Sequence, residues 1–185
     1  GVIKSGGLAD VAKALPLQLQ ANGHKVTVVM PSYSIIPNVQ DFHVVGHATL
    51  NEYDEDPRRR IPYSIKKTSL ANSQVDLILI DCPRYFDRTS LYGDNNQAYG
   101  DNGERYAFFC AAAIEACKIL NFRPDILHCN DWHTGLAPMI LRLKYAHDEF
   151  FNKTRSLITI HNAAFQGVFD RNQIFMIPEI KDVYN

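Results

Sequence analysis

Hydrophobic positions along the chain follow two spacings, one typical of amphipathic helices and one typical of buried strands. In Leu8–Leu19 the apolar residues recur every three or four positions, which predicts a helix that buries one face on a sheet. We expect Pro16 to kink this helix and Gly23 to end it in a left-handed cap. The β-branched run Lys25–Met30 then predicts a short strand.

The alternation of helices and strands continues through the chain. Further strands are predicted at Val75–Ile80, Ile126–Cys129 and Ser156–Ile160, and further helices at Glu104–Leu120 and Gly135–Tyr145. The polar stretch before Val75 predicts an inserted hairpin, with Phe42–Val45 and Tyr63–Lys67 on either side of a charged turn. Residues 81–103 are rich in Gly, Asn, Asp and aromatic residues and predict an ordered surface loop. The whole pattern predicts an α/β fold, a Rossmann-like doubly wound parallel sheet.

Composition and charge narrow the class of protein. The chain has 185 residues, 46% of them hydrophobic and 21% charged, which suits one globular domain covering residues 1–185. The formal net charge of -1 provides no global basic field for nucleic acid or an anionic membrane, so we expect neither as a partner and any anion site must be local. No apolar run approaches the roughly 18 residues that span a bilayer. The four cysteines form no C-x-x-C pair, which favours reduced thiols.

Polar side chains follow two of the predicted strands, at the position where such sheets bind ligands. Asn130, Asp131 and His133 come after Ile126–Cys129, and His161 and Asn162 come after Ser156–Ile160. Ligands of doubly wound sheets bind outside the carboxyl ends of the strands, so these side chains predict one site.

The segment Lys4-Ser5-Gly6-Gly7 opens the first helix. A cation and two glycines at a helix N-terminus favour an anion such as phosphate, while the alternative is a capped turn whose glycines allow tight packing. Neither a Walker loop nor G-x-G-x-x-G is present. The strand-end rule would place a strand before Lys4, so we expect a first strand to precede this chain.

The cluster His128–Thr134 sets a carboxylate, an indole and an imidazole on a strand-to-helix turn, which suits binding of sugar hydroxyls against a stacking wall. As H-x-x-D-x-H it also allows a metal site, although the spacing supplies no third ligand. A structural alternative has Asp131 capping the next helix and His128 in the core.

Two more polar segments have both functional and structural interpretations. His161-Asn162, with Gln166-Gly167 downstream, offers donors and acceptors for a polyol. In Y-x-D-N-x-x-R, which spans residues 99–105, Asp101 or Asn102 also suits an N-cap. By contrast, the D-x-D of residues 54–56 lies in a charged turn, and we interpret it as solvated.

Taken together, the motifs Lys4–Val11, Tyr99–Asn102, Asp131–Leu136 and His161-Asn162 with Phe165–Gly167 resemble the N-terminal domain of bacterial glycogen synthases and plant starch synthases. The resemblance covers essentially the whole chain, with Ser5 where the family usually has Thr. It implies the N-terminal half of a two-domain GT-B glycosyltransferase that moves glucose from ADP-glucose to the non-reducing end of an α-1,4-glucan, with retention. It also implies that a C-terminal domain, outside this chain, completes the cleft and that this chain alone is inactive.

The resemblance assigns roles residue by residue. It implies that Lys4 contacts donor phosphate, that Gly6 and Gly7 let the backbone approach it, and that Asp131 and His161 hold the transferred glucose near the reacting carbon, with Lys4, Asp131 and His161 as the catalytic set. The remaining substrate-binding residues that it implies are Asp10, Tyr99, Asn102, His133, Asn162 and Gln166.

The resemblance implies no metal and no other cofactor. Bacterial cytoplasm is the expected location, with the plastid stroma of a plant as the alternative. From the residues alone, two other functions stay open: a non-catalytic glucan-binding fragment, and a metal-dependent hydrolase that uses His128, Asp131 and His133.

Overall fold

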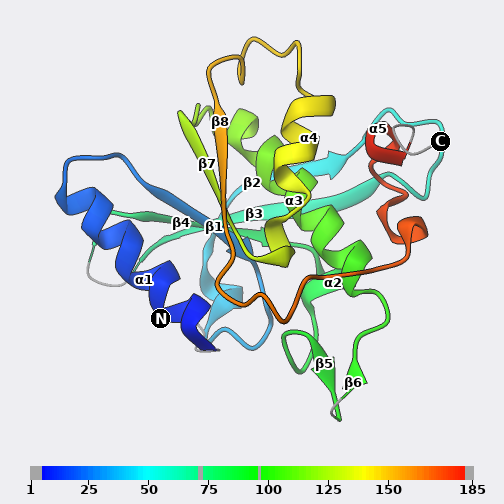
Figure 1. Ribbon diagram of the computed structural model, residues 1–185, viewed down its shortest axis with the longest axis horizontal. Coiled ribbons are helices and arrows are strands. Elements are labelled where there is room, and N and C mark those ends of the chain that lie inside the picture. The colour runs from blue at the N-terminus through cyan, green and yellow to red at the C-terminus, as the bar shows by residue number, and fades with distance from the viewer. Residues whose placement is uncertain (1–5, 71–72, 96, 182–185) are drawn as a thin grey trace. The chain divides into compact units, whose positions relative to one another are not determined.

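A computed structural model describes residues 6–70, 73–95 and 97–181. The chain divides into two compact units: Gly1–Ala48 with Pro62–Asp94, and Thr49–Ile61 with Asn95–Asn185. Each unit combines helices with parallel strands (Figure 1), which confirms the predicted α/β class. None of the helices described is long and apolar enough to cross a membrane.

The first unit contains a four-stranded sheet with the strand order β1-β4-β3-β2. The strands are β1 (Thr27–Pro31), β2 (His43–Leu50), β3 (Ile61–Ser69) and β4 (Asp76–Asp81). β1 pairs with β4 in parallel, from Thr27 opposite Asp76, whereas β3 pairs with β4 in antiparallel register. β2 and β3 are the predicted inserted hairpin, and they extend a parallel pair with strands of a second orientation.

The helix α1 (Gly6–Ala21) precedes β1 and packs against it. Pro16 lies inside the helix and is buried. The helix ends as predicted at Gly23, whose φ of 89° is left-handed. There the amide of Gly23 donates to the carbonyl of Gln20 at 2.9 Å, and the amide of His24 donates to that of Leu19 at 3.1 Å, so two carbonyls of the last turn are satisfied.

The prediction of a surface loop over residues 81–103 is wrong for its first part. A short helix, α2 (Pro83–Phe86), follows β4 directly, and Tyr85 and Phe86 are completely buried. The ring of Phe86 meets that of Tyr33 edge to face, with centroids 5.6 Å apart. Two large aromatic side chains bury enough apolar surface to hold this segment in the core despite its polar neighbours. The rest of the segment contains the short strands β5 (Gly93–Asp94) and β6 (Gln97–Ala98).

The second unit is built around the helix α3 (Asn102–Ile119), which is buried along most of its length. Against it pack the 3-10 turns η2 (Trp132–Thr134) and η3 (Arg171–Ile174) and the helix α4 (Ala137–Leu143). The short helix α5 (Pro178–Lys181) packs on α4.

In the first unit, the turn η1 (Val39–Asp41) precedes β2. Cys82, Cys110, Cys117 and Cys129 are buried free thiols, as the sequence predicted.

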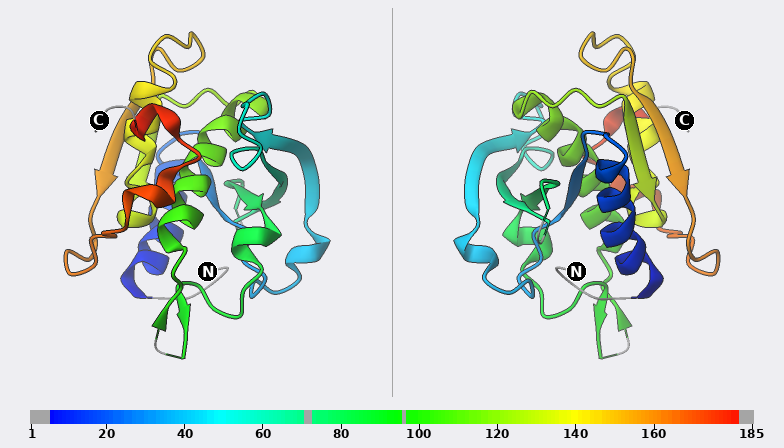
Figure 2. Two further views of the ribbon diagram at one scale, coloured as in Figure 1. Left: turned by 90° about the vertical axis from the view of Figure 1, so that its right-hand side faces the viewer. Right: turned by 90° about the vertical axis from the view of Figure 1, so that its left-hand side faces the viewer.

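The strands β7 (Ile126–Asn130) and β8 (Arg155–Thr159) form a parallel two-stranded sheet, and the right-hand view of Figure 2 shows them side by side. The strand predicted at Ser156–Ile160 is present, but the prediction that it is buried is wrong. Leu157 and Ile158 are 51% and 45% exposed. Burial of both faces of a strand requires covering layers on both sides, and half-exposed neighbours on alternate faces show that β8 lacks them within the described residues.

Candidate active site at the ends of β7 and β8

The register of β7 and β8 brings the two polar segments that follow them together. Asn130 is the residue opposite Thr159, so the chain leaves both strands at the same level. The amide of Asp131 donates to the carbonyl of Thr159 at 2.8 Å, which extends the pairing by one residue. Asp131, His161 and Asn162 therefore lie at one edge, as the strand-end rule predicted.

Asp131 holds this edge with both its backbone and its carboxylate. The side chain is 6% exposed, and Oδ1 accepts the amide N–H of His161 at 2.6 Å and that of Asn162 at 3.3 Å. The interpretation of Asp131 as a helix cap is wrong, because its side chain makes no capping hydrogen bond to η2. Its carboxylate instead fixes the start of the segment after β8.

The backbone of Asp131 is strained. Its φ of 57° and ψ of -174° lie in a region that residues other than glycine rarely adopt, at a cost of about 1 to 3 kcal/mol. Two hydrogen bonds to a carboxylate, each charge-assisted, offset a cost of this size. Strain held in this way occurs preferentially at functional sites, where it sets the direction of a side chain.

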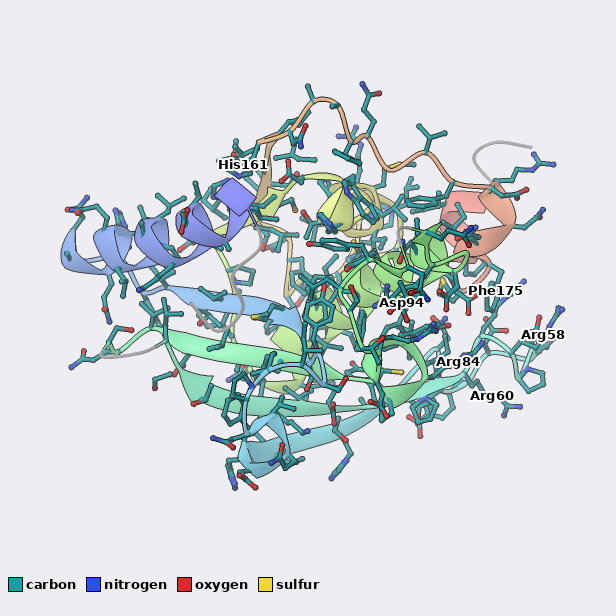
Figure 3. All side chains as sticks on the ribbon, turned by 90° about the horizontal axis from the view of Figure 1, so that it is seen from below. Arg58, Arg60, Arg84, Asp94, His161 and Phe175 are labelled. Atoms are coloured by element: carbon teal, nitrogen blue, oxygen red, sulfur yellow. The ribbon has the colours of Figure 1, made fainter. Side chains whose placement is uncertain are left out.

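His161 is exposed (Figure 3), as is Asn162, whereas Asp131 is buried. Its ring nitrogen Nε2 lies 2.9 Å from the side-chain oxygen Oδ1 of Asn130. Asn130 is in turn held by Thr134, whose hydroxyl donates to the carbonyl of Asn130 at 2.8 Å and accepts its amide N–H at 2.6 Å. The sequence placed Asn130 among the polar residues at the end of this strand, and the structure adds its contact with the ring of His161.

His133 is half-buried among aromatic rings, and both of its ring nitrogens are shielded from solvent. Its imidazole stacks on the indole of Trp132, with centroids 4.0 Å apart and planes 29° apart, and meets Tyr106 edge to face. Burial lowers the pKa of His133 to about 4, against which the nearby Asp131 carboxylate raises it. The ring is therefore neutral at pH 7, and its contact with substrate stays a prediction that this placement does not favour. His128, the other histidine of the cluster, places Nε2 2.7 Å from the hydroxyl of Thr159.

Tyr99 and Asn102 surround a buried cation. Arg105 is completely buried on α3, and its Nη1 donates to Oδ1 of Asn102 at 2.6 Å. Its guanidinium lies over the rings of Tyr99 and Tyr106, at 5.1 and 5.5 Å from their centroids. Stacking and a hydrogen bond to Arg105 thus account for both predicted residues structurally, and their place along a sugar cleft stays a prediction.

Gln173 joins two segments of the predicted site and was missed from the sequence. Its Oε1 accepts the amide N–H of Glu104 at 3.2 Å, and its Nε2 donates to the carbonyl of Gly100 at 3.1 Å. This side chain supplies the cap at the start of α3, where Asp101 occupies the N-cap position without a side-chain capping bond. No local pattern identifies a cap that comes from 69 residues away.

The segment after His161 turns back over Trp132. Gly167 has a φ of 64°, and a Cβ at this position would lie 2.6 Å from Cβ of Trp132. A glycine is therefore required here by both conformation and space. Between His161 and Gly167, two side chains bond the local backbone. Oδ1 of Asn162 accepts the amide N–H of Ala164 at 3.1 Å, and Nε2 of Gln166 donates to the carbonyl of Ala163 at 3.2 Å. Asn162 and Gln166 are exposed, so both remain accessible to a ligand.

The predicted phosphate site belongs to the first unit. Lys4 lies outside the described residues, and Gly6 is the first residue of α1. Gly7 and Asp10 are exposed, and a Cβ on Gly7 would meet nothing within 4 Å in the described part of the chain. Tight packing therefore does not explain Gly7. The functions of Lys4, Gly6, Gly7 and Asp10 stay predictions.

Among the residues that the structure describes, the acidic groups form no cluster that could hold a metal ion, and the D-x-D turn is paired with arginines. Across residues 6–70, 73–95 and 97–181, no three His, Cys, Asp or Glu side chains form a group that could hold a metal ion. In the D-x-D turn, Arg58 pairs with Asp56 at 2.7 Å and Arg59 pairs with Asp54 at 3.4 Å. Hydrogen bonds from Arg58 lower the pKa of Asp56 to about 2. Figure 3 shows Arg58 on the loop that joins β2 and β3, in agreement with a charged turn.

Comparison with known proteins shows which family this chain resembles. The family described as "Starch synthase catalytic domain" matches residues 1–184. A curated relative named "Glycogen synthase" from Aeromonas salmonicida is 52% identical over 182 residues, 98% of this chain and 37% of the relative. The protein of the same name from Aliivibrio salmonicida is 45% identical over 184 residues, 100% of this chain and 37% of the relative. The chain thus spans a little over a third of the length of these relatives.

A solved structure agrees with the sequence comparison. The catalytic domain of starch synthase IV from Arabidopsis thaliana, bound to ADP and acarbose, matches with a TM-score of 0.74 and 26% identity, over 94% of this chain and 34% of that one. The resemblance in sequence is therefore confirmed, and so is the fold class, a Rossmann-like α/β domain of a GT-B protein.

Proposed function

Since this chain belongs to the starch synthase catalytic domain family, we propose that the protein carrying it transfers glucose from ADP-glucose to the non-reducing end of an α-1,4-glucan, with retention. Relatives named glycogen synthase that are about half identical to the chain support this activity. A related catalytic domain bound to ADP and acarbose supports a nucleotide and a glucan as ligands. Two Aeromonas relatives named glycogen synthase favour a bacterial protein acting on glycogen, and we propose that it acts in the cytoplasm.

The observation that carries the proposal is the arrangement at the ends of β7 and β8. Asp131, under strain, fixes the amides of His161 and Asn162, and His161 is left exposed with its ring held by Asn130. An exposed imidazole and carboxamide on a rigid strand end suit recognition of sugar hydroxyls, because both groups can donate and accept. In the proposed complex, His161 contacts the transferred glucose and Asp131 holds His161 in place.

The chemistry to be catalysed is cleavage of the bond between the anomeric carbon and the diphosphate oxygen. The bonding electrons leave with ADP, and the 4-hydroxyl oxygen of the glucan attacks the same face of that carbon and loses its proton to the departing phosphate. Charge develops on both sides, so a site must stabilise an anion and an oxocarbenium-like sugar together. In the proposal, Lys4 and the N-terminus of α1 serve the first need, and the edge formed by Asp131 serves the second. We propose that a C-terminal domain completes the cleft and that no metal takes part.

The test uses the full-length protein with radiolabelled ADP-glucose and glycogen. We expect label to enter glycogen, and we expect His161→Ala to lower kcat about 100-fold, the size of a lost positioning contact. His147→Ala is the matched control, because His147 is an exposed histidine of the same unit that lies outside the site. Lys4→Ala is expected to raise the KM for ADP-glucose.

Two outcomes would contradict the proposal. Full-length protein that binds glucan but transfers no label would favour the non-catalytic glucan-binding alternative. Undiminished transfer by His161→Ala would remove this edge from the active site. The hydrolase alternative has no support from the described histidines and carboxylates, which form no metal-binding group.

A further inference from the structure

His161 is held at two points, by a hydrogen bond from its backbone amide and by a contact of its imidazole ring. The amide N–H of His161 donates to Asp131, and ring nitrogen Nε2 lies 2.9 Å from Oδ1 of Asn130. A carboxamide oxygen has no proton to give, so in this contact Nε2 must be the donor. The contact therefore selects the tautomer of the neutral ring: Nε2 carries the proton, and Nδ1 carries the lone pair.

Asn130 is well placed to enforce this choice. It is the last residue of β7, opposite Thr159 in the register. The hydroxyl of Thr134 bonds both its amide and its carbonyl, so the backbone that bears the carboxamide is fixed on both sides. A side chain on a fixed backbone loses less conformational entropy when it holds a partner than one on a mobile loop.

We propose that Asn130 is a positioning residue, which keeps His161 in the Nε2–H tautomer so that Nδ1 accepts a hydrogen bond from a hydroxyl of the bound hexose. The inference rests on the proposed function, because it takes His161 to be the residue that meets the sugar. His161 is exposed, so its ring remains open to a ligand while Nε2 is engaged. In this tautomer Nδ1 can accept a hydrogen bond from a hexose hydroxyl. In the other tautomer Nδ1 carries the proton and can only donate to the hydroxyl oxygen.

The first test reads the tautomer directly in the full-length protein. Histidine labelled with nitrogen-15 gives long-range proton–nitrogen spectra that separate the two tautomers, and His161→Gln identifies the signals of His161. At pH 8 we expect the Nε2–H pattern in the wild type. We expect Asn130→Leu, which has similar volume and no acceptor, to give a mixture. Asn130→Asp should retain the wild-type pattern, because a carboxylate oxygen also accepts. An Nδ1–H pattern in the wild type would overturn the inference.

The second test is kinetic and separates this inference from the proposed function. Asn130→Leu should lower kcat about 10-fold to 100-fold through misplacement of the ring, and Asn130→Asp should recover most of that loss. If His161→Ala abolishes transfer while Asn130→Leu equals the wild type, the inference fails and the proposed function stands. If His161→Ala has no effect, the proposed function fails at this site. Should Asn130→Leu not fold, the spectra of the wild type and of Asn130→Asp decide the matter.

Discussion

The half-buried histidine His133, whose ring nitrogens are shielded from solvent, predicts a specific dependence of stability on pH. His133 has a pKa of about 4 in the folded chain, against 6.5 for a solvated histidine, and the largest cause is burial. Between these two values the unfolded chain binds a proton at this residue and the folded chain does not. The free energy of unfolding therefore falls as the pH falls from 6.5 toward 4.

The size of the effect follows from the two pKa values. At about 1.4 kcal/mol for each pKa unit, the full difference corresponds to about 3 kcal/mol, reached below pH 4. At pH 5 the contribution is about 2 kcal/mol. This is a large share of the roughly 5 to 15 kcal/mol that stabilises a typical domain.

The assay is urea unfolding at pH 7.5 and at pH 5.0, followed by tryptophan fluorescence. The chain has one tryptophan, Trp132, and its indole stacks on His133, so the signal reports on this site. His133→Phe keeps an aromatic ring and removes the titrating nitrogens. We expect the loss of stability between the two pH values to be about 2 kcal/mol smaller in this variant than in the wild type.

The other histidines of the chain also titrate between pH 7.5 and pH 5.0, so the comparison needs a control. They contribute equally to the wild type and to His133→Phe, so the comparison isolates one ring. His147→Phe, at an exposed position, should leave the pH dependence at its wild-type size. Equal losses of stability in the wild type and in His133→Phe would show that burial of His133 does not control its protonation.

Two further predictions concern the segment that follows His161. Gly167→Ala should destabilise the fold by about 1 to 3 kcal/mol, because the new Cβ would lie 2.6 Å from Trp132 and the backbone is left-handed. Gly100→Ala, whose Cβ would meet no described atom within 4 Å, should stay within about 0.5 kcal/mol in thermal unfolding. Gln173→Ala should cost about 1 to 2 kcal/mol through loss of the cap on Glu104, with faster hydrogen exchange of that amide; unchanged exchange would show that another group provides the cap.

Local pattern was a reliable guide to the elements. The predicted helix Glu104–Leu120 is α3, Asn102–Ile119, and the predicted strand Ile126–Cys129 is β7, one residue longer. Both follow from side-chain periodicity, which is a property of neighbouring residues. The burial of α2 and the exposure of β8 were not predictable in this way, because each depends on what packs against the element and not on the element itself.

The candidate site was likewise predictable in part, where local sequence decides, and unpredictable where distant residues meet. The meeting of Asp131 with His161 followed from the sequence, because two parallel strands end at one edge. The actual bonds did not: Asn130 meets His161 from 31 residues away, and Gln173 caps α3 from 69 residues away. The neutral state of His133 also came from the structure, since burial lowers its pKa and the motif contains no sign of burial.

By itself, the sequence determined the α/β class, the order of the elements, the family and which polar segments follow which strands, all of which are written in local spacing and composition. Only the tertiary structure decided that the Asp131 carboxylate bonds the backbone after β8, that Asn130 lies against the ring of His161, and that His133 lies among aromatic rings. The physical reason is that a hydrogen bond and a buried ring each depend on groups from separate parts of the chain, and folding alone brings these within about 3 to 5 Å of each other.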